Sequence, residues 1–105
     1  MNLQELFKSD FGMDFPISGG TGNSKENPIV VHRKEPNDYV SVEYGVIRCI
    51  GAGRGVDWKI LQQTLMHHDG RRLDQVKVQT MKFVGSEIIT QVENYYFDIT
   101  DCLDF

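Results

Sequence analysis

The sequence predicts an α+β domain, in which a short N-terminal helix packs on a bent, mostly antiparallel sheet of about five strands. Three observations indicate this class. The second half of the chain holds three stretches of similar length, 58–68, 71–84 and 87–99, separated by two short turn signals. The first residues show helical spacing of apolar side chains, and the middle of the chain shows strand-like alternation. The sheet either stays open or closes part-way into a barrel.

Length and composition limit the function classes. The 105 residues suffice for a single domain with one core, and 40% hydrophobic with 25% charged residues is typical of a globular protein. The net charge of -4 argues against a nucleic-acid partner, because phosphate neutralisation needs clustered Lys and Arg. The sequence has neither a run of about 18 apolar residues nor a basic leader, which predicts a cytoplasmic protein without a membrane partner.

The first predicted element is an amphipathic helix that ends at Gly12. Leu3, Leu6, Phe7 and Phe11 follow helical spacing. Residues 13–28 contain prolines and a run of glycines, and we expect a flexible loop that forms neither helix nor strand. This glycine run does not match a phosphate-binding loop, because no Lys-Ser or Lys-Thr pair opens a helix after it.

Two further strands are predicted to form a hairpin. They span 28–35 and 39–50, with the turn at Pro36-Asn37-Asp38. The second strand has the cleanest alternation in the chain, because one face would carry only apolar or aromatic side chains. These side chains are Val40, Val42, Tyr44 and Val46, while Ser41, Glu43 and Gly45 would point the other way.

The segment 51–55 is rich in glycine and follows this predicted strand. A dinucleotide-binding fingerprint places its third glycine three residues after the second, whereas Gly55 comes two residues after Gly53. We therefore expect a sharply bent connection with positive φ at its glycines, and no nucleotide or other cofactor.

Residues 57–68 are compatible with a helix or a strand. Asp57 could cap a helix in which Trp58, Leu61 and Leu65 share one face. The Asp69-Gly70 pair is a strong hairpin signal between two stretches of similar length, and it favours a strand. We expect Trp58, the only tryptophan, to be mostly buried.

The last two stretches complete a predicted meander. In 71–84 the apolar alternation changes phase after Val78, which predicts a bulge near Thr80. In 87–99 large side chains occupy both faces, so this strand is predicted to be central or covered on both sides.

Few residues suggest chemistry. His67 and His68 are neighbours, and adjacent strand residues point to opposite faces, so no metal site is predicted there. Cys49 is expected in the core, Cys102 near the C-terminus could be an exposed thiol, and the two do not form a metal-binding pair. No serine or cysteine lies in a recognisable nucleophile motif, and we assign no catalytic residue.

The predicted function is that of a small non-enzymatic interaction module, which acts as a homodimer or on another protein through its surface. The alternative is a small-ligand or enzymatic pocket on the concave face of the sheet, lined by aromatic side chains, with Arg48 or Arg54 holding an anionic group. The candidate ligand-binding residues are Tyr44, Arg48, Arg54, Trp58 and Tyr95.

Overall fold

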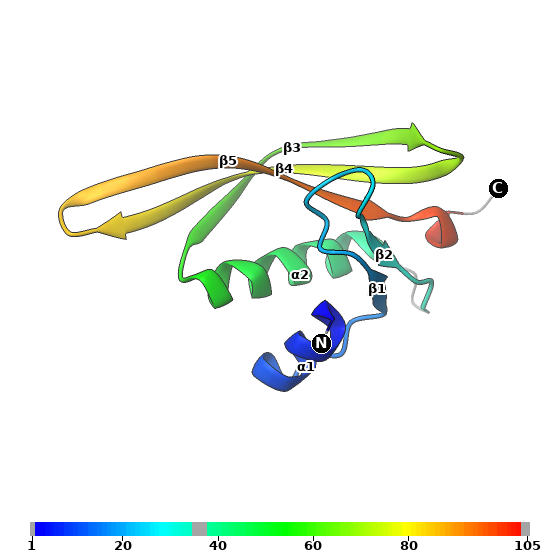
Figure 1. The fold of residues 1–105 in the computed structure, drawn as a ribbon, viewed down its shortest axis with the longest axis horizontal. Coiled ribbons are helices and arrows are strands. Elements are labelled where there is room, and N and C mark those ends of the chain that lie inside the picture. The colour runs from blue at the N-terminus through cyan, green and yellow to red at the C-terminus, as the bar shows by residue number, and fades with distance from the viewer. Residues whose placement is uncertain (1, 35–37, 104–105) are drawn as a thin grey trace.

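The computed structural model of the protein describes residues 2–34 and 38–103. Its five-stranded sheet has the order β1-β2-β5-β4-β3, and helix α2 lies across one face of it (Figure 1). All neighbouring strands are antiparallel except β2 and β5, which are parallel. The predicted α+β class is confirmed. The elements are α1 (Leu3–Phe11), β1 (Ile17–Gly19), β2 (Ile29–Val31), α2 (Tyr39–Arg54), β3 (Asp57–His68), β4 (Arg71–Val84), β5 (Glu87–Asp98) and the 3-10 helix η1 (Thr100–Cys102).

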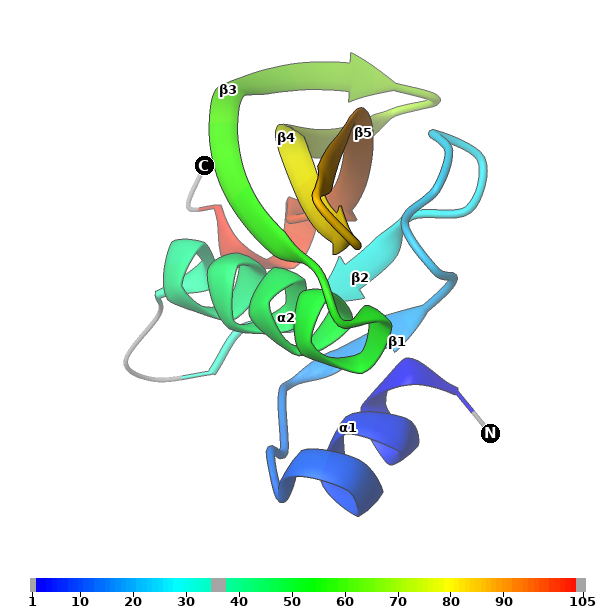
Figure 2. The same ribbon diagram turned by 90° about the vertical axis from the view of Figure 1, so that its left-hand side faces the viewer.

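The sheet is strongly twisted but open. Its two edge strands are β1 and β3, which are not paired with each other in the part of the chain that the structure describes. Figure 2 shows β3 curving around one side of the sheet, away from β1 and β2. The predicted part-way closure into a barrel is therefore wrong, since β1 and β2 span only three residues each and do not reach round to β3.

The predicted meander of three strands is confirmed as β3, β4 and β5. Asp69 and Gly70 both have positive φ, 51° and 76°, as a two-residue hairpin turn requires, and the helical alternative for 57–68 is wrong. The predicted position of the bulge is also wrong. The register shift lies in β3 between Ile60 and Gln62, and the pairing of β4 is regular at Thr80. Strand β5 lies between β2 and β4, and its predicted central position is confirmed.

Residues 39–54 form a helix, and the predicted strand and hairpin are wrong. The Asp38 side chain caps α2 by accepting a hydrogen bond from the Ser41 N–H at 3.1 Å, and Gly55 ends the helix with a φ of 67°. The buried positions follow helical rather than strand spacing, because α2 packs one face against the sheet. They are Glu43, Val46, Ile47, Cys49 and Gly51.

Three smaller predictions concern the turn at 36–38, the glycine segment 51–55 and the two cysteines. In the predicted turn, Pro36 and Asn37 lie outside the described residues. Gly51 and Gly53 belong to α2, so of the glycines in the predicted bent connection only Gly55 has positive φ. Cys102 is buried in η1, not exposed as predicted, while Cys49 is buried as expected, although in a helix.

The segment 13–28, predicted to contain no strand, includes β1. The remainder of the segment crosses to β5, where the Tyr96 N–H donates to the Gly22 carbonyl at 2.8 Å. Trp58 is partly buried beside Gly51 of α2. None of the helices formed by the described residues is both long and apolar enough to cross a membrane.

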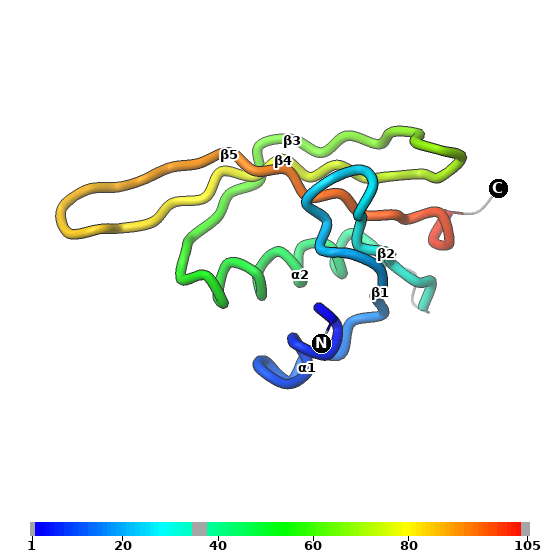
Figure 3. The backbone as a smooth tube through the Cα atoms, in the orientation of Figure 1, coloured from blue at the N-terminus to red at the C-terminus, as the bar shows by residue number. Residues whose placement is uncertain are grey.

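The core fills the space between α2, α1 and the inner face of the sheet. Strands β4 and β5 continue beyond this core and make the protein long, with extents of 50 × 29 × 23 Å (Figure 3). We call residues 81–92, which form the projecting end of the β4–β5 hairpin, the arm. The core residues that are 2% exposed or less include Phe7, Ile29, Val31, Val46, Ile47, Val76, Val78, Phe97 and Ile99.

Candidate functional site

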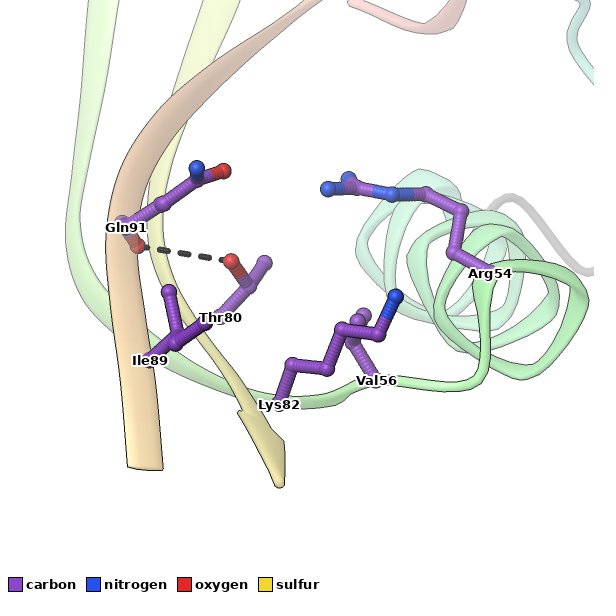
Figure 4. A pocket seen from close by; sticks show the side chains of 6 residues that line it. All are labelled: Arg54, Val56, Thr80, Lys82, Ile89 and Gln91. Atoms are coloured by element: carbon purple, nitrogen blue, oxygen red, sulfur yellow. Dashed lines mark hydrogen bonds between the residues drawn. The ribbon is translucent and has the colours of Figure 1, made fainter. Parts of the chain in front are cut away.

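A cavity of about 210 Å³ opens where the arm leaves the body. It lies between the C-terminal end of α2 and the inner face of β4 and β5, and Figure 4 shows its side chains converging from these elements. Thr80 pairs with Gln91 and Lys82 with Ile89 across the hairpin, so these four side chains share the face turned towards α2. The lining residues are Arg54, Val56, Thr80, Lys82, Ile89 and Gln91.

Arg54 links the end of α2 to the sheet. Its Nη1 and Nη2 donate to the two carboxylate oxygens of Glu93 at 2.7 and 2.8 Å, and Nη1 also donates to the Tyr95 hydroxyl at 3.1 Å. These hydrogen bonds from Arg54 lower the pKa of Glu93, while burial raises the pKa of Tyr95. Because Glu93 offsets the guanidinium charge, Arg54 is held in one geometry and attracts a ligand anion only weakly.

The remaining polar groups suit binding better than reaction. In Figure 4 the Lys82 ammonium extends from β4 into the cavity, towards Arg54. The Thr80 hydroxyl bonds to Glu93 Oε2 at 3.1 Å and lies 3.5 Å from the Gln91 carbonyl oxygen. None of the lining side chains is paired as nucleophile and base, and the volume is below the 300–1,000 Å³ usual for a drug-sized ligand.

The five residues predicted from the sequence are distributed over more than one place. Arg54 lines the cavity and contacts Tyr95. Tyr44 lies nearly three turns earlier on α2 and donates its hydroxyl to Gln63 Oε1 at 3.0 Å. Arg48 is exposed on α2, and Trp58 packs beside Gly51. Three lining residues of the cavity were not predicted from the sequence, because they lie next to α2 only when the β4–β5 hairpin is as long as it is. They are Thr80, Lys82 and Gln91.

A second polar cluster lies between α2 and the sheet, where Glu43 and Asp74 are buried and Gln63 is exposed. Gln63 Nε2 on β3 donates to Glu43 Oε1 at 3.1 Å and also to Asp74 Oδ2. Glu43 is 0% exposed, and its Oε2 has no hydrogen-bond partner among the residues that the structure describes. Burial, and then the facing Asp74, raise the pKa of Glu43 to about 10, so the side chain is neutral at pH 7. This cluster was not predicted, because the predicted strand turned Glu43 away from the core.

Metal binding finds no support among residues 2–34 and 38–103, where no three His, Cys, Asp or Glu side chains gather as a ligand set. His68 Nε2 lies 3.4 Å from Asp69 Oδ2 and 3.9 Å from Glu26 Oε1, and its side chain is 29% exposed beside the β3–β4 turn. Comparison of the chain with protein-family models, curated proteins and solved structures returns no match.

Proposed function

We propose that the protein is an interaction module that forms a homodimer through the outer face of its arm, the face turned away from α2. One observation carries this proposal. Phe83 and Ile88 pair across the hairpin on this face and are 65% and 60% exposed, and Val92 on the same face is 54% exposed. Contiguous exposed apolar side chains on a soluble domain commonly mark an interaction site.

The chemistry of the face favours a second copy as the partner. Between Gln79 and Val92 the outer face carries only uncharged side chains, namely Gln79, Met81, Phe83, Ile88, Thr90 and Val92. A strongly charged partner would gain nothing from such a face, whereas a two-fold related copy presents the same apolar surface to it. The arm also projects clear of α1 and α2, which leaves room for two arms to meet (Figure 1).

The edge of β5 supports the same arrangement. In the described residues β5 pairs with β2 only at Phe97 and Asp98. Residues 87–95 of β5 therefore keep one edge without a neighbouring strand, and an unpaired edge readily accepts a strand from another chain. A partner arm paired along this edge would extend the sheet and set the two apolar faces side by side.

Sedimentation equilibrium at micromolar concentration tests the proposal. We expect a dimer mass for the parent protein and a monomer mass for the double change Phe83→Ser with Ile88→Ser. Leu65→Ser is the matched control, since Leu65 is comparably exposed but lies on β3, outside the arm. A monomeric parent protein, or a double variant that stays dimeric, contradicts the proposal.

The cavity beside Arg54 supports a second candidate function, the binding of a small anion at Lys82. The observation that favours it is the convergence of the Lys82 ammonium with the Thr80 and Gln91 side chains on one cavity. Isothermal titration with phosphate or acetate should show binding that Lys82→Ala removes and Lys59→Ala, on exposed β3, leaves intact. Equal binding by both variants contradicts this candidate.

A further inference from the structure

Three residues far apart in the sequence lie in a row at the other end of the sheet. Ser18 of β1 pairs with Val30 of β2, so Ser18 and His32 occupy diagonal positions on the same face. Val30 in turn lies beside Asp98 of β5, and η1, which follows β5, brings Asp101 next to His32. The row therefore runs Ser18, His32, Asp101 across β1, the end of β2 and η1.

The distances match the order of a nucleophile, a base and an orienting carboxylate. Ser18 Oγ lies 2.6 Å from His32 Nε2, and Asp101 Oδ2 lies 3.7 Å from His32 Nδ1. With its proton on Nδ1, His32 accepts the Ser18 hydroxyl proton at Nε2 and directs Nδ1–H towards the carboxylate. The His32 and Asp101 side chains are 48% and 53% exposed, so both have room to shorten the second contact when a substrate binds.

A cleft adjoins the serine. Ser18 lines a narrow crevice with Leu3, Gly19 and Gly20. The same Leu3, Gly19 and Gly20, together with Asn2, Leu6 and Thr21, line a wider cleft of about 360 Å³. The leucines of α1 give this cleft an apolar wall, which suits the hydrocarbon part of an acyl group.

The residue after the serine can supply a hydrogen bond to the reacting oxygen. Gly20 N–H donates to Pro28 O and His32 N–H to Pro16 O, at 2.9 and 2.8 Å, so the even-numbered positions of β1 bond to β2. Ser18 lies between these two bonds and pairs with Val30, so its carbonyl turns towards β2. The N–H of the same peptide, that of Gly19, turns towards the open edge of β1, where the cleft lies, although Gly19 itself has a positive φ of 84°. A side chain at position 19 would bring Cβ within 2.8 Å of Val30 Cγ2, and only glycine fits.

We infer that Ser18, His32 and Asp101 form a catalytic site that hydrolyses esters of small apolar acids, an activity separate from the contact made by the arm. Ser18 Oγ attacks the carbonyl carbon while its proton passes to His32 Nε2, and the oxyanion faces the Gly19 N–H. The C–O bond to the alcohol then breaks, and His32 protonates the departing alcohol. Water attacks the acyl-serine by the same proton route, which releases the acid and restores Ser18.

A fluorophosphonate probe and p-nitrophenyl butyrate test the nucleophile. We expect the probe to label the folded parent protein on Ser18, identified by mass spectrometry of the labelled peptide. Ser18→Ala should lower the hydrolysis rate about 100-fold or more and remove the label. Ser86→Ala, in the turn of the arm, is the matched control and should keep both. Absence of labelling in the parent protein, or labelling at another residue, overturns the inference even if Ser18→Ala fails to fold.

The role of Asp101 as a positioning residue has its own readout. Asp101→Asn should lower kcat about 10-fold or more while KM stays the same, because the carboxylate orients His32 without contacting the substrate. Asp101→Glu, which keeps the charge, should recover part of kcat. If Asp101→Asn leaves kcat unchanged, the three-residue arrangement is overturned.

Discussion

The two ends of the β4–β5 hairpin have the same backbone structure and opposite surroundings. Near the body, Val76, Val78 and Phe97 are 0% exposed, because α2 covers the inner face. In the arm, Phe83 and Ile88 sit in an equally regular antiparallel ladder, but on the outer face, which α2 does not cover, and they are the most exposed large apolar side chains among the described residues. Regular strand pairing therefore says nothing about burial, which depends on whether another element reaches that part of the sheet.

This difference gives apolar residues two roles along one hairpin. In the body they stabilise the fold by leaving water, at about 25 cal/mol for each Å² of apolar surface buried. In the arm they remain in water in the isolated chain, and the proposed dimer contact would bury them. A substitution of the same residue type at each end should separate these roles.

The largest expected effect comes from that pair of substitutions. Phe97→Ala should lower the free energy of unfolding by about 3–5 kcal/mol, because it removes a fully buried ring from the central strand. Phe83→Ala should change the free energy of unfolding by less than about 0.5 kcal/mol in the monomer. Urea denaturation at a protein concentration where the chain is monomeric measures both.

Phe97→Leu provides a milder test if Phe97→Ala does not fold, since it retains most of the buried volume. Similar losses for Phe83→Ala and Phe97→Ala would contradict the division of the hairpin into a buried and an exposed end.

The same division explains how much of the fold the sequence could predict. The meander was predictable because its turns depend on local chemistry, as at Asp69 and Gly70 with their positive φ. The helix at 39–54 was not, because β-branched residues such as Val40, Val42 and Val46 alternate as they would in a strand. There the tertiary packing of α2 outweighs local propensity, and the capping by Asp38 decides where the helix begins.

The candidate sites were still less predictable. Two of the residues predicted from the sequence, Arg54 and Tyr95, do contact each other. Arg54 lies at the end of α2, and Tyr95 lies on the last strand, β5. Glu93, Lys82 and Ser18 were not named, since each gains its neighbours from the three-dimensional pairing of strands. The spacing of residues along the chain does not reveal which strands pair with each other.

The second largest effect is expected from the buried acid in the body. The pKa of Glu43 is raised to about 10 in the folded protein, above its ordinary value of 4.5. The folded state therefore holds a proton that the unfolded state releases above about pH 4.5. The stability linked to this proton is fully present below pH 4.5 and is lost as the pH rises towards 10.

Glu43→Gln should remove this pH dependence. The amide keeps an acceptor for Gln63 Nε2 and adds a donor towards Asp74, without a proton to lose. At pH 7 we expect the variant to be more stable than the parent by about 2–3 kcal/mol. Urea denaturation between pH 5 and 8 measures it, with Glu26→Gln as the exposed control. A parent protein whose stability does not fall over this range contradicts a neutral buried Glu43.

A smaller effect is expected at the junction of body and arm. Arg54→Met removes the paired hydrogen bonds to Glu93 and should cost about 1 kcal/mol, because the two side chains are 39% and 27% exposed and water screens their charges. The loss should shrink when the measurement is repeated in high salt. Hydrogen exchange should also become faster in residues 80–93 than in residues 73–78. A uniform change along the hairpin would show that Arg54 does not anchor the arm.

The smallest effect is expected at the opposite turn, where the β3–β4 hairpin ends. His67 and His68 leave β3 on opposite faces, and the contacts of His68 with Asp69 and Glu26 are 3.4 and 3.9 Å long. Such surface contacts contribute little, so the double change His67→Ala with His68→Ala should alter the free energy of unfolding by less than about 1 kcal/mol. Thermal unfolding with and without zinc measures this. A zinc-dependent rise in Tm that the double change removes would contradict the assignment of both histidines as surface residues, because it would show that the two imidazoles converge on one ion in spite of leaving β3 on opposite faces.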